Sequence, residues 1–436
     1  MSPPKSRKFL LINPSIYDLR FDWSRWHQPC GLLQIGKYLK AEGHDVRLID
    51  CLQPIRGKRI QRTKLDTILV NDSIFQRWHF GWKWEQIEKR INELRAERWK
   101  PDAIYITSLM TFWWEAIRDL VTVLRNFYPR TRIVLGGVYP QYCLADAKKH
   151  FRGVKFDTEI GKKAKSKPTD FSLYDSVPHF AGLYLHRSRS ANQLVNEIEE
   201  KSDSGVREFA FFDDEIPGTF TSRFEQVLDL IVERQLSIKL LVLGNLSPHA
   251  LNANLVAKMR AAGYRQFYFR DDIALGANAN ADLGAYKKAV ALLSEYGGYM
   301  PYTQDITAMV LVGVPGENLK NVVERIVHLS DIVGSVNLIP FQPTPGTSLY
   351  KQHQAYLDAI PLELQNGKLF PFAQYNGYTF ADYQELIRLA ALLNSKFHGT
   401  TFNFLGEEPI ATMVRKSIAE ESWRPRLRET LQLLPK

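Results

Sequence analysis

Short apolar runs bounded by turn residues alternate with longer stretches of helical periodicity along most of this chain. The first run, FLLINPS, begins at Phe9 and stops at Asn13 and Pro14, as expected of a buried parallel strand. CGLLQIGKYLKAEGHD follows with apolar residues at helical spacing and a stop at Gly43, and VRLIDC has the composition of a second strand. A strand, a helix and a strand in this order predict a parallel β-α-β unit.

The same alternation continues to about residue 150. We expect an irregular insert over 53–71, a helix within WHFGWKWEQIEKRINELRAERW, a strand in DAIYITSLM, a helix from Trp113 to Phe127 and a strand in TRIVLGGVYP. This order predicts a doubly wound, Rossmann-like open sheet, whose ligands bind at the carboxyl ends of the strands.

Three predicted strand ends would meet at that edge. They are Asn13 to Ser15, Ser108 to Thr111 and Gly136 to Tyr139. The glycine pair leaves room for a flat or phosphate-bearing ligand to approach the backbone, or it only forms a turn.

A second α/β region follows a hydrophilic, lysine-rich linker. From REFAFFDDEIPG onward, successive β-α steps without hairpin signals predict a partial β/α barrel of the TIM type. The tail contains a helical pattern from Ala381 to Phe397. The predicted α/β organisation is a sheet domain over 1–150, a linker over 151–178, a barrel over 179–350 and an α-rich cap over 351–436.

Acidic residues cluster at one predicted strand end of the barrel. Asp213, Asp214 and Glu215 follow AFF directly, and Asp271 follows a later strand. Neighbouring carboxylates raise one another's pKa and suit the binding of an amine or a metal, so these four are the candidate catalytic residues. The alternative is a solvated strand end that caps the next helix.

The amino-acid composition bears on the cellular location of the protein and on the partners it could bind. Cys30, Cys51 and Cys143 lie too far apart in sequence for a local cysteine metal site or a disulfide framework, which favours a cytoplasmic protein. No window reaches the ~18 apolar residues of a membrane span. The net charge of +10 fits nucleic acid, an anionic membrane or a phosphate-bearing ligand, but a solvated basic surface is the favoured explanation.

The segments LLINPS, PCGLLQIGKYLKAEGHDVRLIDC and ITSLMTFWWEAIRDLVTVLRNFYPRTRIVLGGVYP resemble, in order, the cobalamin-binding domain of cobalamin-dependent radical S-adenosylmethionine enzymes. Two later turns, GVPGE and PTPGT, resemble signature turns of that family's barrel. The resemblance implies cofactor contacts at ten positions. They are Asn13, Ser15, Ser108, Leu109, Thr111, Gly136, Gly137, Tyr139, Gly313 and Gly316.

The family's iron–sulfur motif is missing from this chain. Relatives carry CxxxCxxC between the first barrel strand and the following helix, but here only FAGLYL separates VPH from HRSRSANQLVNEIEE. We therefore expect no iron–sulfur cluster, because such clusters are held by thiolates. The family's cobalt-ligating histidine motif is also absent, since Asp22, His27 and Gly31 have the wrong spacing.

The preferred hypothesis is a cobalamin-binding protein with a degenerate radical-family barrel, which acts in cobalamin-dependent chemistry or methyl transfer, or as a non-catalytic homologue. Two alternatives stay open. One is a non-radical enzyme that binds S-adenosylmethionine or a metal at the acidic barrel mouth, and the other is a basic scaffold for nucleic acid or a partner protein. The partners expected first are a corrinoid and a small-molecule substrate, with neither nucleic acid nor a metal site of side chains expected.

Overall fold

Two compact units make up the chain in this computed structural model. Unit 1 contains residues 1–182 and 342–369, and unit 2 contains residues 183–341 and 370–436. The structure describes residues 6–19, 28–55, 59–157, 159–185, 189–213, 215–242, 246–271, 279–299, 305–394, 410–420 and 422–432. The predicted α/β class with parallel sheets is confirmed, but residues 342–369, predicted as the end of the barrel and the start of the cap, belong to unit 1.

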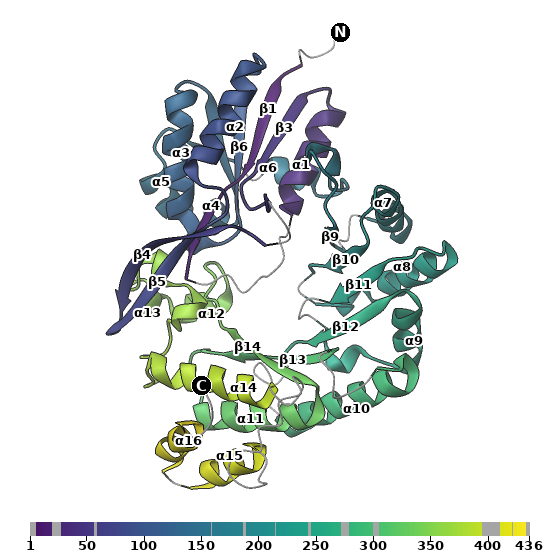
Figure 1. Cartoon of the computed structure of the whole chain (residues 1–436), viewed down its shortest axis with the longest axis vertical. Helices are drawn as coiled ribbons and strands as arrows, with labels where there is room; N and C mark the ends of the chain where they lie inside the picture. Colours follow the sequence, from purple (N-terminus) through teal and green to yellow (C-terminus); the bar gives the residue numbers. More distant parts are fainter. Residues whose placement is uncertain are drawn as a thin grey trace. The chain divides into compact units, whose positions relative to one another are not determined.

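Unit 1 is built on a five-stranded parallel sheet (Figure 1). Its strands are β1 (Lys8–Asn13), β3 (Asp45–Asp50), β6 (Ala103–Ser108), β7 (Arg132–Gly137) and β8 (Lys155–Phe156), in the spatial order β3-β1-β6-β7-β8. The chain therefore adds strands first on one side of β1 and then on the other. The strand order therefore reverses between β1 and β6.

Helices cover both faces of this sheet, because successive side chains of a strand point to opposite faces. Leu10 and Ile12 pack in one apolar core with α2 (Trp84–Ala96) and α3 (Trp114–Phe127). Phe9 and Leu11 pack in a second core with α1 (Cys30–Ala41). The short helices of unit 1 are α4 (Val138–Tyr142), α5 (Leu144–His150), α6 (Glu159–Ala164), α12 (Ser348–Gln352) and α13 (Gln354–Leu357).

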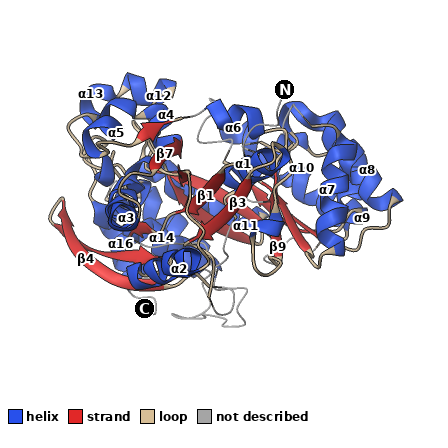
Figure 2. Ribbon diagram, turned by 90° about the horizontal axis from the view of Figure 1, so that it is seen from above, coloured by secondary structure: helices blue, strands red, loops and turns tan. Residues whose placement is uncertain are grey.

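The predicted irregular insert is wrong, because most of it forms a β-hairpin. β4 (Arg62–Val70) pairs with β5 (Ser73–Phe80), which also pairs with β2 (Ile16–Asp18) in an antiparallel sheet. Asn71 and Asp72 form the turn with φ of 47° and 60°, the left-handed values that a tight two-residue hairpin requires. Figure 2 shows β4 as a long curved strand. The helix predicted from Trp78 onward begins only at Trp84.

Unit 2 is organised around a sheet whose strands lie in sequence order. They are β9 (Phe180–Leu183), of which only Leu183 belongs to unit 2, β10 (Glu208–Phe211), β11 (Lys239–Val242), β12 (Tyr264–Phe269), β13 (Ile306–Val312) and β14 (Ser335–Pro340). The pairs from β10 to β14 are parallel. A row of helices accompanies them in Figure 1: α7 (Ala191–Asp203), α8 (Thr221–Glu233), α9 (Ala253–Ala261), α10 (Ala279–Gly297) and α11 (Leu319–Ile332).

Three C-terminal helices complete unit 2: α14 (Phe380–Asn394), α15 (Ile410–Ala419) and α16 (Trp423–Gln432). The Asn394 side chain receives a hydrogen bond from the Val336 N–H at 2.9 Å and donates one to the Val336 carbonyl at 2.7 Å. This amide therefore satisfies backbone groups of the edge strand β14. In the described part of the chain, every helix is too short or too polar to cross a membrane.

Candidate functional site

The carboxyl edge of the unit 1 sheet holds most of the predicted cofactor contacts. At the ends of β1 and β3, Asn13 donates to Asp50 at 2.7 Å, and the Tyr174 hydroxyl donates to the other oxygen of Asp50 at 2.9 Å. Burial, helped by the Asp50 charge, raises the pKa of Tyr174 well above its ordinary value. Asn13 thus belongs to a buried network that ties the two strand ends together.

Ser15 is also used within the protein. Its side chain is buried and its hydroxyl donates to the Trp82 carbonyl at 2.9 Å. Gly81 crosses the strand ends beside it, where a Cβ would lie 2.6 Å from the Cys51 carbonyl oxygen and 2.8 Å from the Ser15 hydroxyl. The backbone after β5 therefore covers the position where Ser15 was predicted to meet a ligand.

The ends of β6 and β7 are joined by Ser108. Its hydroxyl donates to the Gly136 carbonyl at 3.0 Å and accepts from the Tyr139 N–H at 3.1 Å. Gly137 has φ of 91°, and a Cβ there would lie 2.2 Å from the Ser108 carbonyl oxygen. Close packing against β6 therefore explains why glycine stands at residue 137, one of the two alternatives left open by the sequence.

Two predicted contacts at this edge have structural roles. Tyr139 is fully buried and donates its hydroxyl to Asp146 at 2.6 Å, and Thr111 is buried in the 3-10 turn η1 (Thr111–Trp113). The Tyr139 side chain is therefore engaged inside the protein, and its contact with cobalamin stays a prediction. By contrast, Leu109 is 62% exposed and Gly137 is exposed. We call Leu109, Gly137 and the partly exposed Gly136 the rim.

The acidic residues of unit 2 are engaged locally. Asp213 accepts a hydrogen bond from the Leu185 N–H at 2.6 Å, and Glu215 forms an ion pair with Arg270 at 3.2 Å. Asp214 lies outside the described residues. Among the residues that the structure does describe, no group of three His, Cys, Asp or Glu side chains could hold a metal ion.

Asp271, a candidate catalytic residue, is engaged inside the fold. It is buried, accepts from the Leu311 N–H at 2.8 Å and lies 3.3 Å from the guanidinium of Arg325. Arg325 in turn donates to the Leu311 carbonyl at 2.8 Å. This ion pair satisfies the backbone of β13 beyond the end of β12, so the charge of Asp271 is matched inside the fold.

The predicted turn contacts Gly313 and Gly316 also have protein partners. The Gly313 N–H donates to Glu317 at 2.7 Å, and the Gly316 N–H donates to Asn376 at 2.7 Å. The Tyr383 hydroxyl donates to Glu317 at 2.5 Å, and burial raises the pKa of Glu317. Sequence analysis missed Glu317, although an acid that directly follows a Gly-x-x-Gly turn is a usable signal for such a network.

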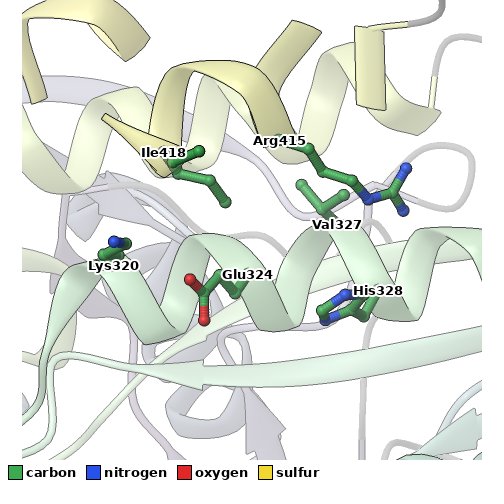
Figure 3. A pocket seen from close by; sticks show the side chains of 7 residues that line it. Lys320, Glu324, Val327, His328, Arg415 and Ile418 are labelled. Carbon is green, nitrogen blue, oxygen red and sulfur yellow. The ribbon is translucent and has the colours of Figure 1, made fainter. Parts of the chain in front are cut away.

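A groove between α11 and α15 has a volume of about 230 Å³ (Figure 3). The buried side chains of Val327, from α11, and Ile418, from α15, line it, and the residues Lys320, Glu324 and His328 follow one another along α11. Small-molecule pockets commonly span about 300–1,000 Å³. This groove is smaller and lies between two helices, whereas the rim of unit 1 lies at the carboxyl edge of a parallel sheet, so the rim is the stronger candidate site.

The three cysteines are separated in the fold. Cys30 begins α1, Cys51 follows β3, and Cys143 lies between α4 and α5. Cys30 and Cys51 are buried, and burial raises the pKa of the Cys51 thiol far above its ordinary value. Burial, with the charge of Asp146, raises the pKa of Cys143 to about 11.

Cys143 is therefore expected to react slowly with iodoacetamide at pH 7. Because the thiolate is the nucleophile and the pKa is about 11, its rate should rise roughly tenfold per pH unit between pH 7 and pH 10. Peptide mass spectrometry of alkylated protein measures this rate, with Cys143→Ser as the control for assignment. A rate that levels off below pH 9 would contradict the raised pKa.

Comparison with known proteins adds no relative. No protein-family model matches the chain, and no curated protein matches it.

Proposed function

We propose that this protein binds a corrinoid at the rim of unit 1 and works without an iron–sulfur cluster. Leu109 and Gly137 are the residues that would hold the macrocycle. When bound, cobalamin supplies cobalt-centred chemistry such as methyl transfer. The role is cobalamin-dependent transfer or corrinoid binding by a non-catalytic homologue.

One observation carries this proposal: an exposed apolar side chain and an exposed glycine lie side by side at the carboxyl edge of a parallel sheet. Leu109 directly follows β6, and Gly137 is the last residue of β7. The two strands are paired, with Ser108 opposite Gly137. A flat macrocycle can approach the backbone at a glycine and bury an apolar side chain at the same time. Ligands of open α/β sheets bind at this edge.

The protein is expected to retain hydroxocobalamin after desalting, with visible corrinoid absorption bands. Leu109→Ser should weaken binding about tenfold, since loss of an apolar contact of this size costs roughly 1.5 kcal/mol. Equilibrium dialysis against hydroxocobalamin measures the dissociation constant.

Leu69→Ser is the matched control, because Leu69 is 68% exposed on the hairpin of the same unit. It removes the same side chain from a different surface and should leave the affinity unchanged. A colourless protein after desalting, or equal losses in both variants, would refute the proposed site.

The carboxylates at the strand ends of unit 2 give less support to the alternative function, a non-radical enzyme that binds S-adenosylmethionine or a metal. Asp213, Glu215 and Asp271 each have a partner within the protein. A ligand would have to compete with these interactions, whereas the rim offers exposed groups.

A further inference from the structure

We infer that the rim receives one face of the corrin macrocycle and leaves the nucleotide tail of cobalamin in solvent. This inference rests on the proposed corrinoid site and specifies which part of the ligand that site recognises. It follows from how the protein fills the spaces between its strand ends, so the ligand class includes corrinoids that have no nucleotide.

The crevice between β1 and β6 is the place where a tail could enter, because the strand order reverses there and the following segments diverge. A cluster of four buried apolar side chains fills it. Ile16 follows β1, Phe112 and Trp113 follow β6, and Phe80 ends β5. Opening the crevice would expose this cluster to water, which costs free energy in proportion to the apolar area.

A hydrogen bond closes the same crevice on its polar side. The Trp113 indole N–H donates to Asp18 at 3.1 Å, which connects the segment after β6 with the segment after β1. Asp18 is buried and also receives hydrogen bonds from Asn366 at 2.9 Å and from the Leu19 N–H at 2.6 Å. A ligand that displaced Trp113 would break this hydrogen bond to a buried carboxylate, at a cost of roughly 1–3 kcal/mol.

The neighbouring interval between β3 and β1 is closed as well. Asp50 joins Asn13 to Tyr174, and a Cβ at Gly81 would overlap the Cys51 carbonyl oxygen and the Ser15 hydroxyl. Both oxygens of the Asp50 carboxylate and the Ser15 hydroxyl are thus engaged by groups of the protein, and a nucleotide would have to compete with these hydrogen bonds.

The segment 342–369, which we call the strap, closes the outer side. Asp18 pairs with Lys368 at 3.2 Å, and the Trp114 indole N–H donates to Glu363 at 3.3 Å. Gly346 packs so closely on Tyr142 that a Cβ there would lie 2.6 Å from its ring. The strap therefore packs against the segments that follow β1, β6 and β7, while Leu109 and Gly137 of the rim stay exposed.

The test compares hydroxocobalamin with aquacyanocobinamide, a corrinoid that lacks the nucleotide, by equilibrium dialysis with the full chain. Equal dissociation constants, within about threefold, are expected, because the shared macrocycle face makes the contacts. Hydrogen exchange should show protection by either ligand at residues 108–111 and 136–142, with residues 13–19 and 50–53 unchanged.

Binding of hydroxocobalamin at least tenfold tighter than that of cobinamide, with protection at residues 13–19, would overturn this inference and leave the corrinoid site standing. Binding of neither corrinoid would overturn both. Leu109→Ser serves as an internal check, since it should weaken both ligands by the same factor while Leu69→Ser weakens neither.

Discussion

Replacement of Glu197 by leucine is expected to destabilise the protein by about 3–5 kcal/mol. Glu197 lies on α7 between Arg189 and Lys201 and forms ion pairs with both, and the side chains of all three are at most 5% exposed. Leucine would leave two cations buried without their shared carboxylate, and an uncompensated buried charge is far more costly than the net gain from the original pair. Urea unfolding followed by circular dichroism measures the loss.

Two further variants separate this effect from a general loss of helix stability. Glu199→Leu on the same helix removes a half-exposed partner of Arg234, and it should cost no more than about 1 kcal/mol. The triple change Arg189→Met, Glu197→Leu and Lys201→Met removes all three charges and should recover most of the stability. A triple variant as unstable as Glu197→Leu alone would show that packing, and not charge, dominates at this position.

Gly137→Ala is expected to lower the free energy of unfolding by about 3–5 kcal/mol, because it combines backbone strain with steric overlap. The residue has φ of 91° and ψ of −163°, a region open almost only to glycine. A Cβ would lie 2.2 Å from the Ser108 carbonyl oxygen, so the ends of β6 and β7 would have to separate. Thermal unfolding should shift downward by about 10 °C.

Gly153→Ala is the matched control in the same unit. Gly153 also has a positive φ, of 71°, but no atom lies within 4 Å of the position of its Cβ. Gly153→Ala should lower the free energy of unfolding only through backbone strain, by about 1–2 kcal/mol. Equal losses in the two variants would mean that the close approach of β6 and β7 contributes nothing.

The apolar pattern determined the elements of this protein well. Runs such as FLLINPS and DAIYITSLM became the parallel strands β1 and β6, because a strand buried on both faces needs a continuous apolar sequence. Helical periodicity likewise located α1 and α3. The hairpin β4–β5 was missed because β4 is largely exposed and because the end of β5, from Trp78 to Phe80, was assigned to the following helix.

The sequence by itself also determined which residues follow the strands, and hence which of them gather at the carboxyl edge. Only the tertiary structure decided which of these face solvent. Tyr139 and Leu109 were equal candidates in sequence, yet one is buried beside Asp146 and the other is 62% exposed. The return of the strap to Asp18 was equally hidden, since Asn366 and Lys368 lie about 350 residues away. Burial depends on contacts between such distant segments, and local sequence patterns do not predict these contacts.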